Sequence, residues 1–195
     1  LYKVVISQIN LFSVLMVLIE ELKEFTKKGV KKTEEVRLLL SLLAERLKGY
    51  VVFSTSFSYE DQYITDIILR NNIDIEIFTI DTGRLHEETY KVFDETIKMY
   101  GNVIKVYYPN NIEVEELLMK KGPYSFYNSV EDREECCRIR KLNPLSVALS
   151  GKCCWVTGIR REHSQFRSRK EIFEIDEKRG LIKCNPILDI NIEDI

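Results

Sequence analysis

Short apolar runs alternate with amphipathic stretches from residue 51 onward. The runs at 51–53, 75–80 and 103–107 are typical of buried strands, because each is brief and rich in β-branched or aromatic residues. Between them the apolar residues recur at helical spacing, and the second helix is expected over 85–100. The residues expected to face inward are Tyr63, Ile64, Ile67 and Ile68 in the first helix and Val92, Phe93 and Ile97 in the second. This order predicts an α/β fold with a doubly wound, mainly parallel sheet, in which ligands bind beyond the carboxyl ends of the strands.

The pattern changes after the third strand. A helix is predicted near 112–119, followed by a loop of polar and aromatic residues over 122–135. We then expect a helix over 137–149 that is bent at Pro144, because proline in a helix interior removes a hydrogen bond. Further short strands are predicted at 153–157, 172–175 and 181–184.

The N-terminal stretch at 4–19 is strongly apolar, but polar residues interrupt it and a charged run follows directly. It is short for a membrane span, which needs about 20 apolar residues, and it lacks the cleavage site of a signal peptide. We therefore interpret it as a helix that is buried or that faces a partner, including a second copy in a homo-oligomer. We expect an N-terminal helical segment at 1–48 and one α/β domain at 49–195, and the start at Leu1 without methionine suggests a piece of a longer protein.

Composition narrows the class of protein. Hydrophobic residues make up 45% of the chain, as expected for a soluble globular domain. Lys and Arg total 29 against 31 acidic residues, so the formal net charge of -2 gives no reason to expect nucleic acid or a membrane as a partner. Five cysteines without regular spacing indicate a reducing compartment, and hence a cytoplasmic protein, rather than a disulfide-stapled secreted domain.

The first expected strand leads into the hydroxyl-rich segment Ser54-Thr55-Ser56-Phe57-Ser58, which precedes a helix. Its hydroxyls and the helix N-terminus offer the neutral donors and the positive dipole end that bind phosphate or sulfate. The alternative is a serine-rich N-cap without a ligand. The sequence has no Gly-x-x-x-x-Gly-Lys-Ser/Thr motif, which argues against a nucleoside triphosphate loop.

The second expected strand leads into Asp81-Thr82-Gly83-Arg84. The Asp81 carboxylate lies where it can accept hydrogen bonds from an adenine amine or a ribose hydroxyl, and Gly83 permits close backbone approach. Alternatively, Asp81 and Thr82 cap the helix that follows. We interpret His86, in the first turn of that helix, as a surface residue because the sequence offers no partner for it.

A basic loop follows the strand predicted at 153–157. It contains five cations against the single acid Glu162. The arginine fork matches the oxygens of sulfate and phosphate, so this loop is a candidate anion site. A solvated basic face or an RNA-contacting loop is the alternative. The candidate ligand-binding residues of the loop are Gly158, Arg160, Arg161, Ser164 and Arg167.

Two adjacent cysteines, Cys136 and Cys137, are followed directly by the cations Arg138, Arg140 and Lys141. Neighbouring cations favour the thiolate, which is the form that ligates metal, so the pair suits a metal-sulfur cluster beside a bound anion. The alternative is a pair of free cysteines near the start of a helix. The other three cysteines fall in predicted strands and are interpreted as core residues; they are Cys153, Cys154 and Cys184.

Five segments in this order resemble the assimilatory sulfonucleotide reductases, that is, the adenylyl-sulfate and phosphoadenylyl-sulfate reductases, from about Tyr50 to the end of the chain. They are Ser-Thr-Ser-Phe-Ser at 54–58, Ile-Asp-Thr-Gly-Arg-Leu-His-Glu-Glu-Thr-Tyr at 80–90, Cys-Cys-Arg-Ile-Arg-Lys at 136–141, Trp-Val-Thr-Gly-Ile-Arg-Arg-Glu-His-Ser at 155–164 and Lys-Cys-Asn-Pro-Ile at 183–187. The resemblance implies a sheet of the adenine nucleotide alpha-hydrolase-like type that binds a sulfonucleotide. It also implies that a cysteine thiolate attacks the sulfur of adenylyl sulfate and releases AMP, and that thioredoxin or glutaredoxin then reduces the thiosulfonate to sulfite.

The resemblance also implies roles for individual residues. It assigns Ser54, Ser56 and Ser58 to the phosphosulfate, the segment 81–84 to the nucleoside, and Arg160, Arg161 and Arg167 to the anion. The pair Cys136 and Cys137 resembles the subgroup that carries a 4Fe-4S cluster and prefers adenylyl sulfate without a 3'-phosphate. Lys141 is then expected between the cluster and the substrate.

The chain departs from the family pattern in three respects. It contains two of the four cluster ligands, its nucleophilic cysteine is expected beyond Ile195, and His163 stands where members usually have glutamine. The 195 residues are therefore expected to bind a sulfonucleotide without completing turnover. Three alternatives remain open: a phosphoadenylyl-sulfate reductase, an ATP-pyrophosphatase or sulfate adenylyltransferase relative of the same fold, and a nucleotide-binding protein without reductase activity.

Overall fold

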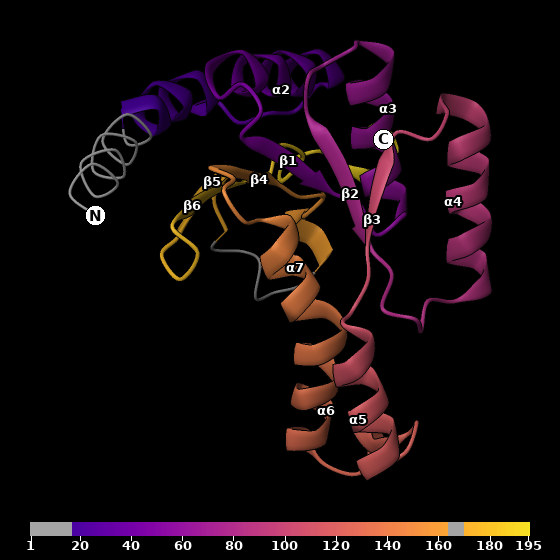
Figure 1. Ribbon diagram of the computed structural model, residues 1–195. Coiled ribbons are helices and arrows are strands. Elements are labelled where there is room, and N and C mark those ends of the chain that lie inside the picture. The colour runs from indigo at the N-terminus through magenta and orange to yellow at the C-terminus, as the bar shows by residue number, and fades with distance from the viewer. Residues whose placement is uncertain (1–16, 164–169) are drawn as a thin grey trace. The chain divides into compact units, whose positions relative to one another are not determined.

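A mostly parallel sheet organises the computed structural model, which describes residues 17–163 and 170–195 (Figure 1). The strands follow the order β3-β2-β1-β4-β6-β5. Their bounds are Val51–Ser54 for β1, Glu76–Ile80 for β2, Ile104–Tyr107 for β3, Cys154–Val156 for β4, Phe173–Asp176 for β5 and Leu181–Cys184 for β6. β1 pairs with β4, β2 with β3 and β4 with β6 in parallel, whereas β5 and β6 are antiparallel. The predicted α/β class with a doubly wound, mainly parallel sheet is confirmed.

The chain divides into two compact units. The first unit comprises Leu1–Ser54, Ser58–Ile75 and Lys152–Ile195, and the second unit comprises Thr55–Phe57 and Glu76–Gly151. The turn that follows β1 therefore belongs to the second unit, although the strand itself belongs to the first. The expected N-terminal segment at 1–48 and α/β domain at 49–195 stay a prediction.

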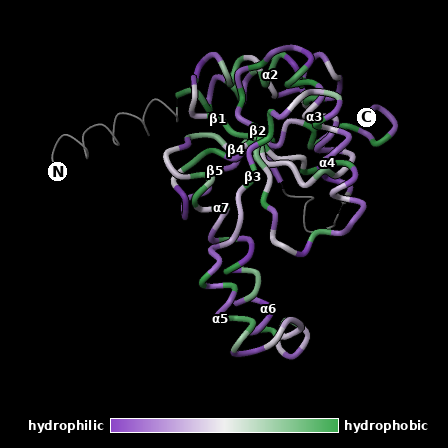
Figure 2. Tube along the Cα trace, turned by 45° about the vertical axis from the view of Figure 1, so that its right-hand side comes forward, coloured by the Kyte–Doolittle hydropathy of each residue, from purple (hydrophilic) through white to green (hydrophobic). Residues whose placement is uncertain are grey.

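Helices of the first unit bury one apolar face each. Residues 17–26 are helical, α2 spans Thr33–Arg46 and α3 spans Tyr59–Arg70. The buried apolar side chains of α2 and α3 are Val36, Leu39, Leu40, Leu43, Ala44, Ile64, Ile67 and Ile68. Their spacing of three and four residues places them on one helix face, and Figure 2 shows green hydrophobic segments along α2. Burying each large side chain stabilises the fold by about 1.5–3 kcal/mol.

The predictions for the helices of this unit are largely confirmed. Ile64, Ile67 and Ile68 are buried as expected, whereas Tyr63 is half-buried and its hydroxyl donates a hydrogen bond to Thr33 Oγ1 at 2.8 Å. In the apolar stretch at 4–19, only its last residues lie among those described. No helix in the described part of the chain is long and apolar enough to cross a membrane.

Three cysteines of the first unit lie in its core. Cys153, Cys154 and Cys184 are all buried, which confirms their interpretation as core residues. Burial raises the pKa of each of these thiols, because a thiolate loses its hydration in apolar surroundings. Two short 3-10 helices complete the unit, η3 at Arg161–His163 and η5 at Ile192–Asp194.

The second unit carries helices on and beyond the strand pair β2 and β3. Its helices are α4 (Glu87–Tyr100), α5 (Asn111–Lys121), the 3-10 helix η1 (Ser125–Tyr127), α6 (Val130–Cys137), the π-helix η2 (Arg138–Leu142) and α7 (Asn143–Ala148). α7 packs on β2 and β3, and η1 packs on α6. The helix predicted near 112–119 is confirmed as α5.

The expected inner face of α4 is partly wrong. Val92 is exposed, Phe93 and Ile97 are half-buried, and the buried residue of the helix is Thr96. Thr96 reaches this position because its hydroxyl donates to the Val92 carbonyl at 2.6 Å, which satisfies the polar group inside the helix. Gly101, with φ of 83°, ends the helix one residue after Tyr100.

The cysteine-bearing helix was predicted with the wrong start and the wrong irregularity. The loop expected over 122–135 ends earlier, because Ser129 caps a helix that begins at Val130. A π turn at Arg138–Leu142 then precedes Pro144, which lies in the first turn of α7. Pro144 lacks an N–H and its ring crowds the carbonyl four residues earlier, and the wider π turn accommodates both. Cys136 and Cys137 therefore end α6, and the alternative that they lie near the start of a helix is wrong.

Candidate functional site

The turn after β1 is held in an unusual backbone conformation. Phe57 has φ of 61°, the left-handed region that a side chain rarely adopts. Its ring stacks on Phe93 at 4.7 Å between centroids, and its N–H donates to Thr55 Oγ1 at 3.1 Å. These contacts hold a conformation that costs about 1–3 kcal/mol, and such strain is common at ligand sites. Ser56, between the two, is exposed.

The other two serines of the segment lie in the first unit and have protein partners. Ser58 is the N-cap of α3 and its Oγ accepts a hydrogen bond from the Asp61 N–H at 3.3 Å. The N-cap alternative is therefore confirmed at Ser58. Ser54, the last residue of β1, accepts a hydrogen bond from Trp155 Nε1 at 2.8 Å.

Gly158, one of the candidate residues after β4, leaves space for the first turn of α3. A Cβ atom at this position would lie 2.1 Å from Asp61 Oδ1. Asp61 itself is buried. Only glycine fits here, so the start of the basic loop lies directly against the helix that follows the serine segment.

Arg160 is buried and already carries two carboxylate partners. Its Nε donates to Glu60 Oε1 at 3.1 Å and its Nη1 to Glu162 Oε2 at 2.9 Å. Its Nη1 also approaches the Ile190 carbonyl at 3.5 Å. Arg160 is therefore part of a charge-balanced network that ties three segments of the first unit together. The expectation that Arg160 holds an anion stays a prediction.

Arg161 is paired in a similar way. Its Nε donates to Asp189 Oδ1 at 2.8 Å and its Nη1 to the Lys170 carbonyl at 2.7 Å. The loop after β4 therefore places both leading arginines in protein contacts. The candidates Ser164 and Arg167 lie outside the described residues.

In the second unit, Asp81 follows β2 and its carboxylate is engaged on both oxygens. Oδ1 accepts from the Gly83 N–H at 2.8 Å, and the Tyr90 hydroxyl lies 3.0 and 2.9 Å from Oδ1 and Oδ2. Burial raises the pKa of Tyr90, and the hydrogen bond to Asp81 raises it further. Asp81 and Thr82 do not cap α4, whose N-cap is His86, so the capping alternative is wrong. His86 is exposed, as expected.

Arg84 is directed to an aromatic loop. Its guanidinium lies 4.3 Å from the ring centroid of Phe126 and 5.7 Å from that of Tyr124. Its Nη1 donates to the Pro123 carbonyl. Stacking of this kind is typical of arginine on aromatic faces. The structure thus gives Arg84 a role in holding 123–126.

Arg140 was not among the predicted ligand-binding residues, and one of its buried nitrogens has no hydrogen-bond partner among the described residues. It is buried, and its Nη1 donates to the Thr82 carbonyl at 2.8 Å. A Cβ atom at Gly83, whose φ is 69°, would lie 3.3 Å from the same Nη1. Within the described ranges its buried Nε has no acceptor and no carboxylate pairs with it. A buried charge without such a partner is costly, which points to an anion that binds beside it.

The tandem cysteines lie in the same continuous helical stretch as Arg140. Cys136 is buried against Leu117 and Ile139, whereas Cys137 is exposed. Lys141, one turn after Cys137, is also exposed. No set of three or more His, Cys, Asp or Glu side chains among the described residues is placed to hold a metal ion. This stretch thus presents two neighbouring thiols, with a buried cation four residues after the first.

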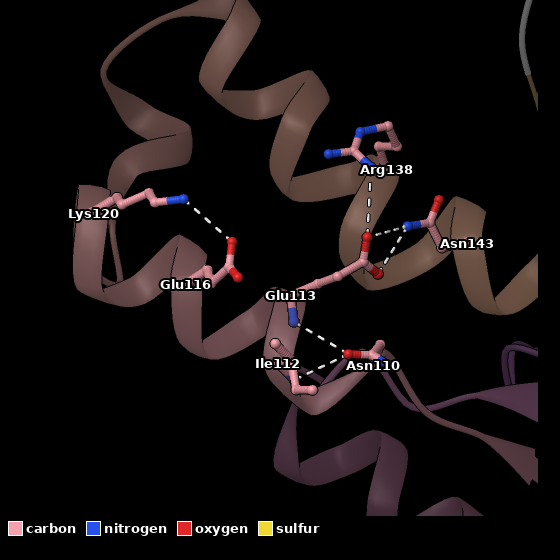
Figure 3. Close-up of polar contacts among 7 residues, drawn as sticks. All are labelled: Asn110, Ile112, Glu113, Glu116, Lys120, Arg138 and Asn143. Atoms are coloured by element: carbon pink, nitrogen blue, oxygen red, sulfur yellow. Dashed lines mark hydrogen bonds and ion pairs between the residues drawn. The ribbon is translucent and has the colours of Figure 1, made fainter.

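Polar contacts with α5 brace this cysteine-bearing stretch (Figure 3). Glu113 accepts from Asn143 Nδ2 at 3.0 and 3.1 Å and lies 3.8 Å from Arg138 Nη1. Asn110 caps α5 through the N–H groups of Ile112 and Glu113. Lys121, near the other end of α5, pairs with Asp132 and Glu135 of α6, and these carboxylates raise its pKa. The helix that carries the cysteines is therefore fixed against α5 at both ends.

A known protein family matches most of the chain. The family described as phosphoadenosine phosphosulfate reductase domain matches residues 50–195. The chain belongs to this family.

Individual relatives within the family are similar over most of this chain. The adenosine 5'-phosphosulfate reductase of Rhizobium meliloti (strain 1021) is 46% identical over 156 residues, which cover 80% of this chain and 58% of the relative. The adenosine 5'-phosphosulfate reductase of Allochromatium vinosum is 42% identical over 151 residues, covering 77% of this chain and 59% of the relative. The chain thus spans less than two thirds of the length of these relatives.

A solved structure of the same family supports the fold. The phosphoadenylyl-sulfate reductase from Candida auris, crystallised as a phosphate complex, superposes with a TM-score of 0.70 at 22% identity. The match covers 89% of this chain and 81% of the other. At this identity the likeness establishes the fold of the family.

Sequence reasoning missed several partners of the predicted residues. Tyr90 ends the motif at 80–90 and Glu60 lies two residues after the segment at 54–58, but the sequence indicated no role for either, although each contacts a candidate residue. Trp155 was treated as part of an apolar strand. The sequence did indicate that Trp155 is placed differently, because a tryptophan between two core residues of a strand points to the opposite face of the sheet. Arg140 had the signal of its spacing, four residues after Cys136, which places both on one side of a helix.

Proposed function

We propose that this chain is the nucleotide-binding part of an adenylyl-sulfate reductase that forms sulfite and AMP in sulfate assimilation. The observation that carries the proposal is the tandem pair Cys136 and Cys137 at a π turn with the buried, unbalanced Arg140 beside it. Structural π turns are frequent at functional sites. The names of the relatives favour adenylyl sulfate over its 3'-phosphorylated form as the substrate.

The proposed substrate contacts are the candidate residues of the loops that follow the strands. We assign the phosphosulfate to Ser54, Ser56 and Ser58 with Gly158, the nucleoside to Asp81, Thr82, Gly83 and Arg84, and the anion to Arg160, Arg161, Ser164 and Arg167. Because Arg160 and Arg161 are already paired, their proposed role is to hold the backbone of the loop and to share charge with the ligand. Arg140 joins this set as a buried donor without a carboxylate partner.

In the proposed reaction, a cysteine thiolate located beyond residue 195 attacks the sulfur of adenylyl sulfate. The bond between sulfur and the phosphate oxygen breaks, and AMP leaves with the electron pair. One thiolate of a thioredoxin or glutaredoxin then attacks the modified cysteine, which releases sulfite and forms a mixed disulfide. The second thiol of the donor resolves that disulfide. The cationic side chains described above stabilise the negative charge on the leaving phosphate.

The donor set fits a 4Fe-4S cluster in part. Cys136 and Cys137 would hold it through their thiolates, and the two other ligands are proposed to lie beyond residue 195. Two adjacent free thiols, one of them exposed, are the donor chemistry that such clusters take. When bound, such a cluster supplies a fixed local charge next to the substrate. Lys141 is proposed to lie on the substrate side.

The wider setting follows from the same proposal. A thioredoxin-type donor works with reduced thiols, which persist in the cytoplasm, so we propose a cytoplasmic protein. Neither nucleic acid nor a membrane is proposed as a partner. The protein is proposed to form a homo-oligomer.

Iron analysis of a longer protein that contains this chain tests the cluster assignment. We expect an anaerobically purified, brown protein that forms sulfite from adenylyl sulfate with thioredoxin. C136A and C137A should each lose most of the iron, whereas C184A, at a buried core position, should retain it. An active protein that is colourless and iron-free would contradict the cluster. Sulfite formation by the 195 residues alone would contradict a nucleophile beyond residue 195.

A further inference from the structure

Trp155 lies on the face of β4 opposite to that of Cys154 and Val156. Its neighbours Cys154 and Val156 are buried, whereas Trp155 is half-buried. In the parallel pairing of β4 with β1, Trp155 is in register with Val52. Ser54, two residues further along β1, is on the same face of the sheet, because side chains alternate between faces. The indole N–H of Trp155 donates to Ser54 Oγ at 2.8 Å across these strands.

Because Trp155 is the donor in this hydrogen bond, the proton of the Ser54 hydroxyl must point to another partner. An indole nitrogen only donates, so Ser54 Oγ must be the acceptor. A hydroxyl that accepts in this way keeps its own proton for a second partner. In the part of the chain that the structure describes, no acceptor for this proton is found. The hydroxyl is thus left as a donor at the carboxyl end of β1, where ligands of parallel sheets bind.

The ring of Trp155 is held from a second strand as well. Lys183 is in register with Trp155 on β6, and its Nζ lies 5.0 Å from the ring centroid. A cation over the face of an indole is attracted by about 0.5–1 kcal/mol at partly exposed sites. Contacts from β1 and β6 therefore restrict the ring and aim its N–H at Ser54.

We propose that Trp155 is a positioning residue that orients the Ser54 hydroxyl to donate its proton to the phosphosulfate of adenylyl sulfate. The inference rests on the proposed function and adds to it a residue that does not touch the substrate. Because the effect passes through Ser54, it should depend on the anionic group of the ligand. Adenosine, which lacks that group, should bind independently of Trp155.

Calorimetric titration of four forms of the protein tests the proposal: the wild type, W155F, S54A and the double variant. W155F keeps a six-membered aromatic ring for Lys183 and removes the N–H donor together with the five-membered ring that carries it. We expect W155F to weaken adenylyl sulfate about three- to tenfold, as for one hydrogen bond, and to leave adenosine binding within about twofold. The double variant should bind adenylyl sulfate as weakly as S54A alone, because both changes act on one contact. K183M, which keeps the N–H and removes only the cation over the ring, should weaken adenylyl sulfate less than W155F does.

Two further observations make the outcome decisive. The chain contains one tryptophan, so its indole N–H gives a single NMR signal in the wild type without any variant. This signal should shift on addition of adenylyl sulfate and not on addition of adenosine, and the ligand-induced shift should be lost in S54A. Three results would overturn this inference without affecting the proposed function. W155F and the wild type could bind adenylyl sulfate equally, the two changes could have multiplicative effects on affinity in the double variant, or the indole signal could fail to shift with adenylyl sulfate. A wild-type protein that binds adenosine but no adenylyl sulfate would overturn the proposed function and this inference together.

Discussion

Two buried arginines, one in each unit, have opposite surroundings. In the first unit Arg160 donates to Glu60 and Glu162, so its charge is balanced within the protein. In the second unit Arg140 donates to a backbone carbonyl, and its Nε has no acceptor among the described residues. A buried charge needs a partner, and Arg160 has protein partners whereas Arg140 does not. The difference teaches that Arg160 maintains the fold and that Arg140 is available for an anion from outside this chain segment.

The largest expected effect comes from breaking the balanced arginine. R160M leaves the buried Glu60 carboxylate without this guanidinium, and we expect a loss of about 3–5 kcal/mol in the free energy of unfolding. Urea denaturation measures it. R70M is the matched control, because the Arg70–Asp66 pair on α3 is exposed and should contribute less than about 1 kcal/mol. An R160M loss as small as that of R70M would mean that Arg160 is not a structural residue.

A second change tests the rigid surroundings of Arg160. G158A places a Cβ atom 2.1 Å from Asp61 Oδ1, so the Asp61 side chain or the loop must move. We expect a loss of about 1–3 kcal/mol in the free energy of unfolding, as for overpacking elsewhere. D61A removes the clashing atoms, so the double variant G158A/D61A should lose clearly less than the sum of the two single variants. Strict additivity would show that the predicted clash does not occur.

The buried thiols of the first unit are neutral, so their pH dependence can be compared with the behaviour of the charged, buried arginines. Folding raises the pKa of Cys153, Cys154 and Cys184, so their contribution is fully present below the unfolded thiol pKa of about 8.5. Stability should fall as the pH rises above that value, by up to about 1.4 kcal/mol per pH unit for each thiol. Urea midpoints between pH 7.5 and 10.5 measure the slope. C184A should have a shallower slope than the wild type, and an unchanged slope would contradict the assignment.

The smallest expected effect on stability belongs to Arg140. R140M loses one hydrogen bond to the Thr82 carbonyl but removes a desolvated charge, so the free energy of unfolding should change by less than about 1 kcal/mol. The same variant should bind adenylyl sulfate at least about tenfold more weakly, as expected when a buried cationic donor is lost. If R140M lost about 3 kcal/mol or more in the free energy of unfolding, as expected for R160M, the two arginines would not differ in their structural role.

Hydrophobic periodicity was sufficient to predict the sheet, because strand runs and most helix faces are local properties of the sequence. It failed at Val92, whose apolar side chain is exposed while the neighbouring Thr96 is buried through a local hydrogen bond. It also failed at the π turn before Pro144, since sequence pattern alone does not distinguish a broken helix from a widened one.

The motifs located the loops of the candidate site, but they did not show which side chains already have partners within the protein. The sequence shows Arg160 and Arg140 alike as cations near a candidate anion site. One counter-charge of Arg160 is Glu60, 100 positions away, whereas Arg140 has no carboxylate partner among the described residues. The partner of Ser54 is likewise distant in sequence, because Trp155, whose indole N–H donates to its hydroxyl, lies 101 positions later. Such pairings depend on strand order and register, which a single sequence does not specify.

Adenylyl sulfate binding to the 195 residues, compared with binding of its 3'-phosphorylated form, tests the central claim most directly. Calorimetric titration of the wild type and R140M with both nucleotides gives four affinities. We predict that the wild type binds adenylyl sulfate more tightly than the 3'-phosphorylated form, and that R140M loses affinity while retaining its stability. Tighter binding of the 3'-phosphorylated form, or an R140M variant that binds like the wild type, would contradict the account.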